Sequence, residues 1–140
     1  MEASQVELVQ SSFDQVLPIA DTAAALFYKR LFELDPSLRR LFHGDIRQQG
    51  RKLMDTLRLV VSNLGHLDRI VPGVRALGER HAAYGVEERH YDTVGSALLW
   101  TLEKGLGNAF TPDVKKAWVA VYTLLATTMK SAAAESLAAA

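Results

Sequence analysis

The sequence predicts an all-α protein, from the spacing of its apolar residues and from the residues at the ends of each segment. Apolar residues recur three, four and seven positions apart in every long segment, the period of a helix with one buried face. No segment alternates apolar and polar residues convincingly, as a half-buried strand does. Capping residues, prolines and glycines stand where these segments are expected to begin and end.

Length and composition indicate a single globular domain over residues 1–140, with 49% apolar residues. Sixteen basic and sixteen acidic residues cancel, so no overall field attracts nucleic acid or an anionic membrane, and neither is expected as a partner. The longest uncharged run, residues 117–129, is shorter than the roughly 20 residues that span a bilayer. The absence of cysteine and of a secretory signal pattern favours a cytoplasmic protein.

The first half of the chain is expected to form three long helices and a short one. Ser4, with Glu7 three residues later, forms a capping box that starts a helix over residues 4–17, which ends at Pro18. A second helix follows over residues 21–33. Asp35-Pro36 starts a turn or short helix through Phe42, and residues 43–45 form a loop. A long helix over residues 48–64, closed by Gly65, carries an inner face of Gln49, Leu53, Leu57, Val60 and Leu64.

The second half is expected to form three more helices. Pro72 suits the first turn of a helix that stops at Gly85, because proline lacks the amide hydrogen that would go unused there. His90-Tyr91 opens the next helix, and the chain turns over residues 105–107. The inner side of this helix carries Val94, Leu98, Thr101 and Leu102. Thr111-Pro112 then starts a final helix, with Trp118, Tyr122, Leu125 and Met129 facing inward. The Ala-rich residues 131–140 extend it to about Glu135 before it frays.

His81 is the residue that most clearly indicates a function. It shares one helical face with Val74, Leu77 and Tyr84, at about 100° per residue. A neutral imidazole on an apolar face is a suitable iron ligand, and His81 is therefore the predicted metal ligand of a haem pocket. The other histidines, His43, His66 and His90, are expected to be solvated, and only His90 competes for the ligand role.

Tyr28 and Gln49 are predicted to face the ligand on the distal side of that pocket, with Leu53 one turn beyond Gln49. A phenol and an amide in an apolar pocket need hydrogen-bond partners. A donor aimed at bound dioxygen, which carries negative charge, gains roughly 1.5–3 kcal/mol and slows release by about ten- to hundredfold. Carbon monoxide gains less. Gln49 is preferred to Gln48 because only Gln49 has Leu53 four residues later, on the same helical face. Alternatively, Tyr28 is a boundary residue with its hydroxyl in water, and Gln49 is a solvated helix residue.

The ordered set of these residues resembles the bacterial haemoglobins, both the single-domain ones and the haemoglobin domain of flavohaemoglobins. The resemblance extends from the first helix to Glu135. It implies a globin fold of six to eight helices around a haem pocket, with haem b as the cofactor. The residues that carry it are Phe27-Tyr28-Lys29-Arg30-Leu31-Phe32, Asp35-Pro36, Leu41-Phe42, Gln49 with Leu53, His81 and Tyr91.

The resemblance also implies roles for the residues around His81. In flavohaemoglobins a tyrosine and a glutamate hydrogen-bond the proximal histidine and make it a stronger electron donor; Tyr91 and Glu135 stand at matching places, although Glu135 could instead be an exposed charge. Arg80 either reaches a haem propionate or faces solvent. The residues expected to contact the cofactor are Phe42, Leu53, Leu77, Arg80, His81, Val86 and Tyr91.

The expected function is therefore reversible and tight binding of dioxygen, for storage, delivery or scavenging. The alternative is nitric oxide dioxygenation or a peroxidase-like reaction. The sequence contains no glycine-rich nucleotide motif, so a separate reductase or a small reductant is expected to reduce the iron. Nitric oxide and carbon monoxide are further possible ligands. A haem-free helical interaction domain is the remaining hypothesis.

Overall fold

The computed structural model describes residues 1–139 and confirms the all-α class: over this range six α-helices are joined by 3₁₀ helices and loops, without a strand. The α-helices are α1 (Ala3–Val16), α2 (Ala20–Leu34), α3 (Ile46–Ser62), α4 (Val71–Ala83), α5 (Glu88–Leu106) and α6 (Pro112–Ala139). The 3₁₀ helices are η1 (Leu17–Ile19), η2 (Pro36–Leu41), η3 (Leu67–Arg69) and η4 (Gly107–Ala109). None of these helices is long and apolar enough to cross a bilayer.

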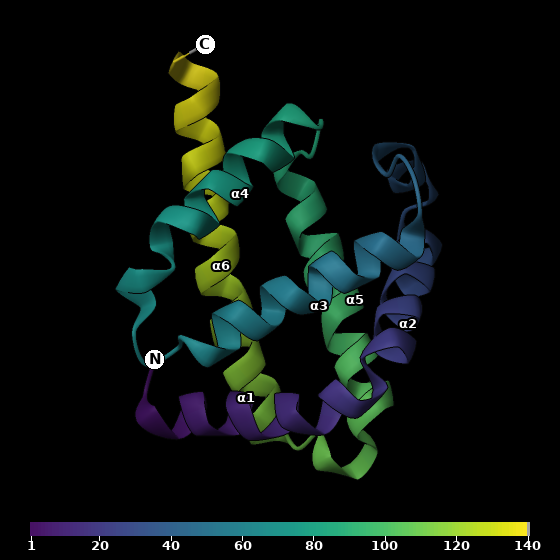
Figure 1. Cartoon of the computed structure of the whole chain (residues 1–140), viewed down its shortest axis with the longest axis vertical. Helices are drawn as coiled ribbons and strands as arrows, with labels where there is room; N and C mark the ends of the chain where they lie inside the picture. Colours follow the sequence, from purple (N-terminus) through teal and green to yellow (C-terminus); the bar gives the residue numbers. More distant parts are fainter. Residues whose placement is uncertain (140) are drawn as a thin grey trace.

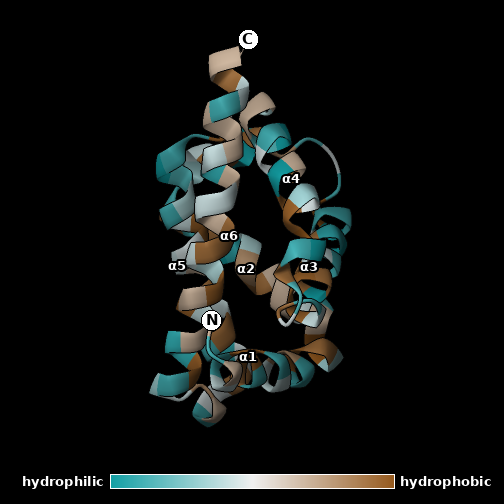
Figure 2. Cartoon of the chain, turned by 90° about the vertical axis from the view of Figure 1, so that its left-hand side faces the viewer, coloured by the Kyte–Doolittle hydropathy of each residue, from teal (hydrophilic) through white to brown (hydrophobic). Residues whose placement is uncertain are grey.

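The helices cross at large angles instead of forming a parallel bundle. Figure 1 shows α1 and α3 lying across α5 and α6, with the C-terminal end of α6 projecting beyond the other helices. Hydrophobic residues line the inner sides of the helices and hydrophilic residues face outward (Figure 2). Trp118 is the largest fully buried side chain. Its ring packs 6.1 Å from that of Phe13, and its Nε1–H donates to the Ser12 hydroxyl at 2.9 Å.

Four predicted helix ends differ from the structure, two of them because another residue makes the capping contact. The N-cap of α1 is Glu2 and not Ser4: the Glu2 backbone N–H donates to Gln5 Oε1 at 3.3 Å. Helix α3 starts two residues earlier than expected because Asp45 Oδ1 accepts the Arg47 N–H at 2.9 Å. It ends at Ser62, so Gly65 lies beyond the helix, and α6 continues past Glu135 to Ala139.

The predicted inner face of α3 is fully buried only in its second half. Leu57, Val60 and Leu64 are buried, whereas Gln49 and Leu53 are half-buried. The most buried positions in the first half are instead Gly50 and Met54. Gln49 and Leu53 thus lie on the flank of α3, beside its contact with the core.

Candidate functional site

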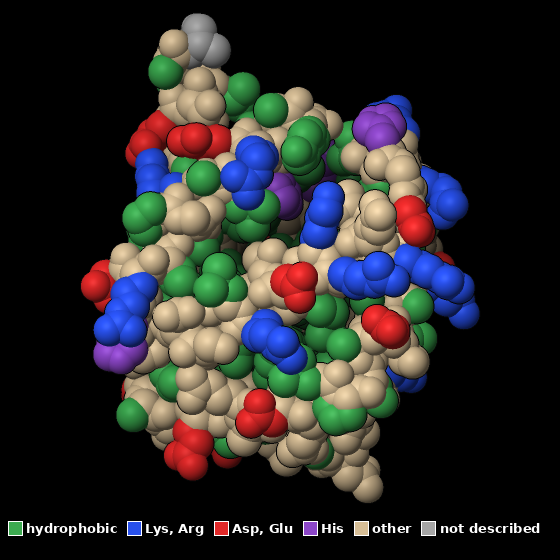
Figure 3. Space-filling view, in the orientation of Figure 1, with side chains coloured by type: hydrophobic (Ala, Val, Ile, Leu, Met, Phe, Trp, Pro, Cys, Tyr) green, Lys and Arg blue, Asp and Glu red, His purple; other side chains and the backbone are tan. Residues whose placement is uncertain are grey.

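Helices α3 and α4 are consecutive in the chain but form opposite walls of an opening, here called the α3–α4 gap. Helix α3 packs on α2 and α1, α4 packs mainly on α6, and few close backbone contacts join α3 to α4 over the described residues. A cleft of about 380 Å³ lies between the two helices, and its lining includes Leu77 and Arg80. The space-filling view shows a hollow on this side of the molecule, with a histidine side chain inside it (Figure 3).

His81 is half-buried on α4, the proximal wall. Burial lowers the pKa of its imidazole; the Leu77 carbonyl one turn earlier opposes this, and the Arg80 cation adds to the lowering. The imidazole is therefore held neutral, the state in which it can bind a metal. Although the Leu77 carbonyl favours the charged form, the buried Nδ1 atom makes no hydrogen bond of normal geometry with any described group.

The backbone of His81 is fixed by the way α4 ends. The Val86 N–H donates to the His81 carbonyl at 2.9 Å, and the Gly85 N–H donates to the Ala82 carbonyl at 3.1 Å. This pair of bonds is a Schellman motif, which needs a left-handed residue after the helix. Gly85 supplies it with φ 95°, and the predicted stop at Gly85 is confirmed.

Tyr28, Phe42 and Gln49 come together beside α3, the distal wall. The Tyr28 hydroxyl donates to the backbone carbonyl of Gln49 at 3.3 Å, and the Phe42 ring packs edge-on against Tyr28 with centroids 5.4 Å apart. Burial raises the pKa of Tyr28 to about 12, so its hydroxyl remains protonated at neutral pH. Gln49 is half-buried whereas Gln48 is exposed, and the contact with Tyr28 is made by the Gln49 backbone carbonyl.

Over the described residues, Tyr91 and Glu135 make no hydrogen bond to each other or to His81. Glu135 forms a salt bridge with Arg75 of α4, and its side chain is 66% exposed. Tyr91 is buried, and burial raises its pKa; its hydroxyl has no hydrogen-bond partner among the described residues. The charged group beside the Tyr91 ring is Lys130, whose Nζ lies 5.6 Å from the ring centroid.

The remaining predicted residues divide between the interior and the rim. Leu77 and Val86 are half-buried against the core, and Arg80 is exposed at the rim of the cleft. His43 and His66 are exposed, as predicted. The prediction that His90 is solvated was wrong: it is 5% exposed, and its Nδ1 accepts the Glu87 N–H at 2.9 Å.

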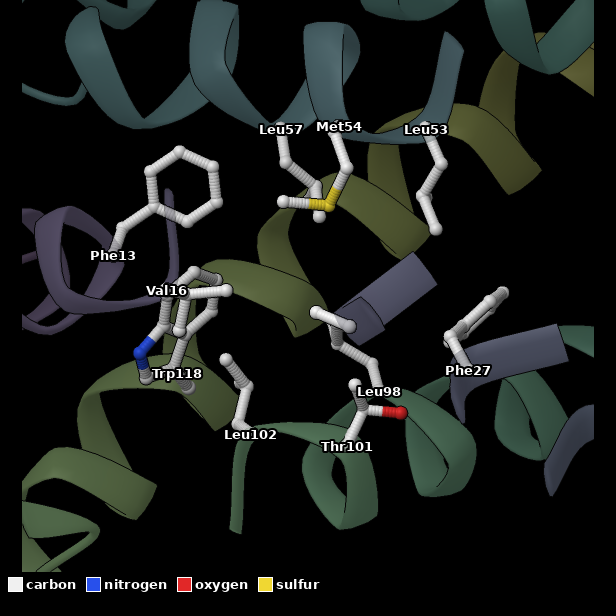
Figure 4. Close-up of a pocket in the computed structure, with 11 residues that line it drawn as sticks. Phe13, Val16, Phe27, Leu53, Met54, Leu57, Leu98, Thr101, Leu102 and Trp118 are labelled. Carbon is white, nitrogen blue, oxygen red and sulfur yellow. The ribbon is translucent and has the colours of Figure 1, made fainter. Parts of the chain in front are cut away.

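Sequence reasoning missed two features near the site. Arg75 and Lys130, the charged neighbours of Glu135 and Tyr91, come from other helices, and no local pattern indicates such pairings. A small cavity of about 20 Å³ lies behind Leu53, between α1, α2, α3, α5 and α6 (Figure 4). The Thr101 hydroxyl at its wall donates to the Ala97 carbonyl at 2.8 Å, so the cavity is essentially apolar.

These groups fit a haem. The described residues contain no cluster of three or more His, Asp or Glu side chains that could ligate a metal. They do provide one neutral histidine, His81, on the proximal wall of the α3–α4 gap, and a buried phenol donor, Tyr28, beside the distal wall. A single protein ligand is sufficient when the metal arrives in a macrocycle that supplies the others.

Comparison with known proteins agrees with this fold. Residues 25–129 match the globin family model. The flavohaemoprotein of Bacillus subtilis is 28% identical over 129 residues, covering 90% of this chain but only 32% of that protein. Neuroglobin of Tetraodon nigroviridis is 28% identical over 143 residues, covering 92% of this chain and 90% of that protein.

A solved structure shows the same fold over almost the whole chain. It is an engineered carbene transferase made from a candidate nitric oxide dioxygenase of Rhodothermus marinus, with a TM-score of 0.90, 24% identity, and coverage of 99% of this chain and 97% of that one. The family model covers most of the chain, and the crossed helices around an open gap agree with it, so this protein belongs to the globin family and its site is consistent with haem binding.

Proposed function

We propose that the chain holds haem b in the α3–α4 gap, with His81 as the iron ligand, and that it binds dioxygen reversibly. When bound, the haem would supply the metal centre at which a diatomic ligand is held. The neutral state of His81 supports its assignment as ligand. Phe42, Leu53, Leu77 and Val86 would exclude water from the cofactor, and Arg80 stands at the rim where a propionate would reach solvent.

The observation that carries the proposal is the buried Tyr28 hydroxyl. It is protonated at neutral pH, and its one hydrogen bond, to the Gln49 carbonyl, is long at 3.3 Å. Rotation of this hydroxyl toward the gap would exchange that weak bond for one to a ligand that carries negative charge. The exchange favours dioxygen over carbon monoxide, because the more negative acceptor forms the stronger bond.

Tyr28→Phe tests this role. The variant should release dioxygen about ten- to hundredfold faster than the wild type in stopped-flow measurements, with a smaller effect for Gln49→Leu. Carbon monoxide release should change less. Tyr84→Phe is the matched control, because Tyr84 is 65% exposed and should leave both rates unchanged. An equal change in the two release rates for Tyr28→Phe would show that the ring acts by packing alone.

Nitric oxide dioxygenation, or a peroxidase-like reaction, is the second candidate. It is favoured by the similarity to a flavohaemoprotein and by the fold shared with a candidate nitric oxide dioxygenase. In either reaction Tyr28 and Gln49 would orient the reacting ligand. Sustained nitric oxide dioxygenation would also need a separate reductase to supply electrons to the haem, whereas a peroxidase-like reaction would draw its electrons from the reducing substrate. Nitric oxide consumption by the oxygenated protein, measured with and without a flavin reductase, distinguishes sustained turnover from oxygen carriage.

A further inference from the structure

The connection between α4 and α5 is four residues long, and all its backbone donors are used. Tyr84 donates to the Arg80 carbonyl at 3.0 Å, and Gly85 and Val86 complete the Schellman motif. The Glu87 N–H instead donates to a side chain, the Nδ1 of His90, at 2.9 Å. The His90 imidazole thus holds the last residue of a segment whose first bonds fix the end of α4.

His90 can hold this contact only in one protonation state. Because Nδ1 accepts a hydrogen bond, it carries a lone pair, and the ring proton is on Nε2. An imidazolium has a hydrogen on both nitrogens and cannot accept the Glu87 N–H. The side chain is 6% exposed, so little space is available for the ring to turn and retain the bond.

We propose that His90 is a positioning residue for the proximal side of the site: its neutral imidazole fixes residues 84–87 and, through Val86, the helix end that carries His81. Protonation of His90 releases the Glu87 N–H and loosens this segment, so the geometry of His81 becomes sensitive to pH. This inference rests on the proposed role of His81 as iron ligand, although the contact between Glu87 and His90 exists without it.

The charged side chains in the cluster around His90 are two carboxylates and two arginines. Glu87 Oε2 lies 3.6 Å from His90 Nε2 and also pairs with Arg89 at 2.9 Å. The hydrogen bond from Arg89 lowers the pKa of Glu87, and Arg40 contributes to this lowering. The second carboxylate near His90 is that of Asp35, which precedes η2, and the hydrogen bond from the Ser37 hydroxyl lowers its pKa. Both carboxylates therefore stay ionised between pH 5.5 and 8, roughly the range in which histidine changes charge.

The test compares His90→Asn, His90→Ala and the wild type in the haem-loaded chain. Asparagine offers an amide oxygen that accepts the Glu87 N–H but does not titrate, whereas alanine offers no acceptor. The first readout is the iron–histidine stretching band of the ferrous protein from pH 8 to 5.5. The second, in loaded and haem-free protein, is amide exchange at Glu87. His66→Asn is the control, because His66 is exposed.

The wild-type band should shift reversibly as the pH falls, the Asn variant should keep its band, and the Ala variant should show the shifted band already at pH 8. Exchange at Glu87 should be about tenfold faster in His90→Ala than in the wild type at the same pH. An Asn variant that follows the wild-type pH profile, or an Ala variant that matches Asn at pH 8, would overturn the proposal. Failure of the wild type to take up haem would instead contradict the proposed function. The exchange measurement on the haem-free protein would still test the contact between Glu87 and His90.

Discussion

At the scale of single residues, long-range contacts decide which polar groups can serve the site. Glu135 has the residue type expected of a group that supports a proximal histidine, but Arg75 of α4 neutralises it at an exposed position. Tyr91 and His81 Nδ1 are both buried without a hydrogen-bond partner among the described residues. Tyr91 is therefore the member of the predicted pair that remains available to accept a hydrogen bond from His81.

Conservative substitutions should distinguish the effect of Tyr91 on His81 from that of Glu135. Glu135→Gln should leave the iron–histidine stretching frequency unchanged and alter stability by less than about 1 kcal/mol, because exposed ion pairs contribute little. Tyr91→Phe should lower the frequency, because an imidazole that loses its acceptor is a weaker donor to iron. Resonance Raman spectra of the ferrous variants provide the measurement. A shift in Glu135→Gln as large as that in Tyr91→Phe would restore the predicted Tyr91–Glu135 network.

At the scale of secondary-structure elements, the position of α4 depends on how closely it approaches α6. A Cβ atom built on Gly78 would lie 2.7 Å from the Met129 Cα, within the backbone of α6. That contact is with main chain, which cannot rotate away as a side chain would. Gly78, one turn before His81 on the same helix, therefore sets the distance at which the proximal wall stands from α6.

Gly78→Ala should destabilise the protein by about 1–3 kcal/mol, because the helix must move or strain to admit the methyl group. Gly73→Ala, in the same helix, has no neighbouring atom within 4 Å of the new Cβ and should instead stabilise by about 0.4–1 kcal/mol. Urea unfolding of the haem-free proteins gives both values. Equal effects of the two substitutions would show that α4 is not in close contact with α6 at this point.

At the scale of the whole molecule, the fold encloses a core while keeping α3 and α4 apart. Helices α2, α5 and α6 hold the two walls through their own packing, and few backbone contacts cross the gap among the described residues. A cofactor in the gap would supply the missing contacts between the walls. Such binding stabilises the native state according to its affinity, because the unfolded chain has no preformed site.

Haem should therefore raise the thermal midpoint of the wild type, by an amount that corresponds to about 4 kcal/mol when free haem is at 1,000 times its dissociation constant. His81→Ala should lose most of this gain together with the Soret band, whereas His66→Ala, altered at an exposed position, should retain both. Thermal unfolding without haem and with haem in excess of the protein is the measurement. Full stabilisation of His81→Ala by haem would reject His81 as the ligand.

The sequence by itself determined the local features: the helical class, the proline at the start of α4 and the glycine that ends it. It also placed His81 on one face with Val74 and Leu77, but Tyr84, predicted on the same face, is exposed. The local features could be predicted because helix periodicity and capping depend on residues within a few positions of one another. Only the tertiary structure decided that Glu135 pairs with Arg75, sixty positions away, and that the His90 side chain is buried. It also decided that α3 and α4 stand apart. Such outcomes depend on how helices distant in sequence pack, which the period of a single helix does not specify.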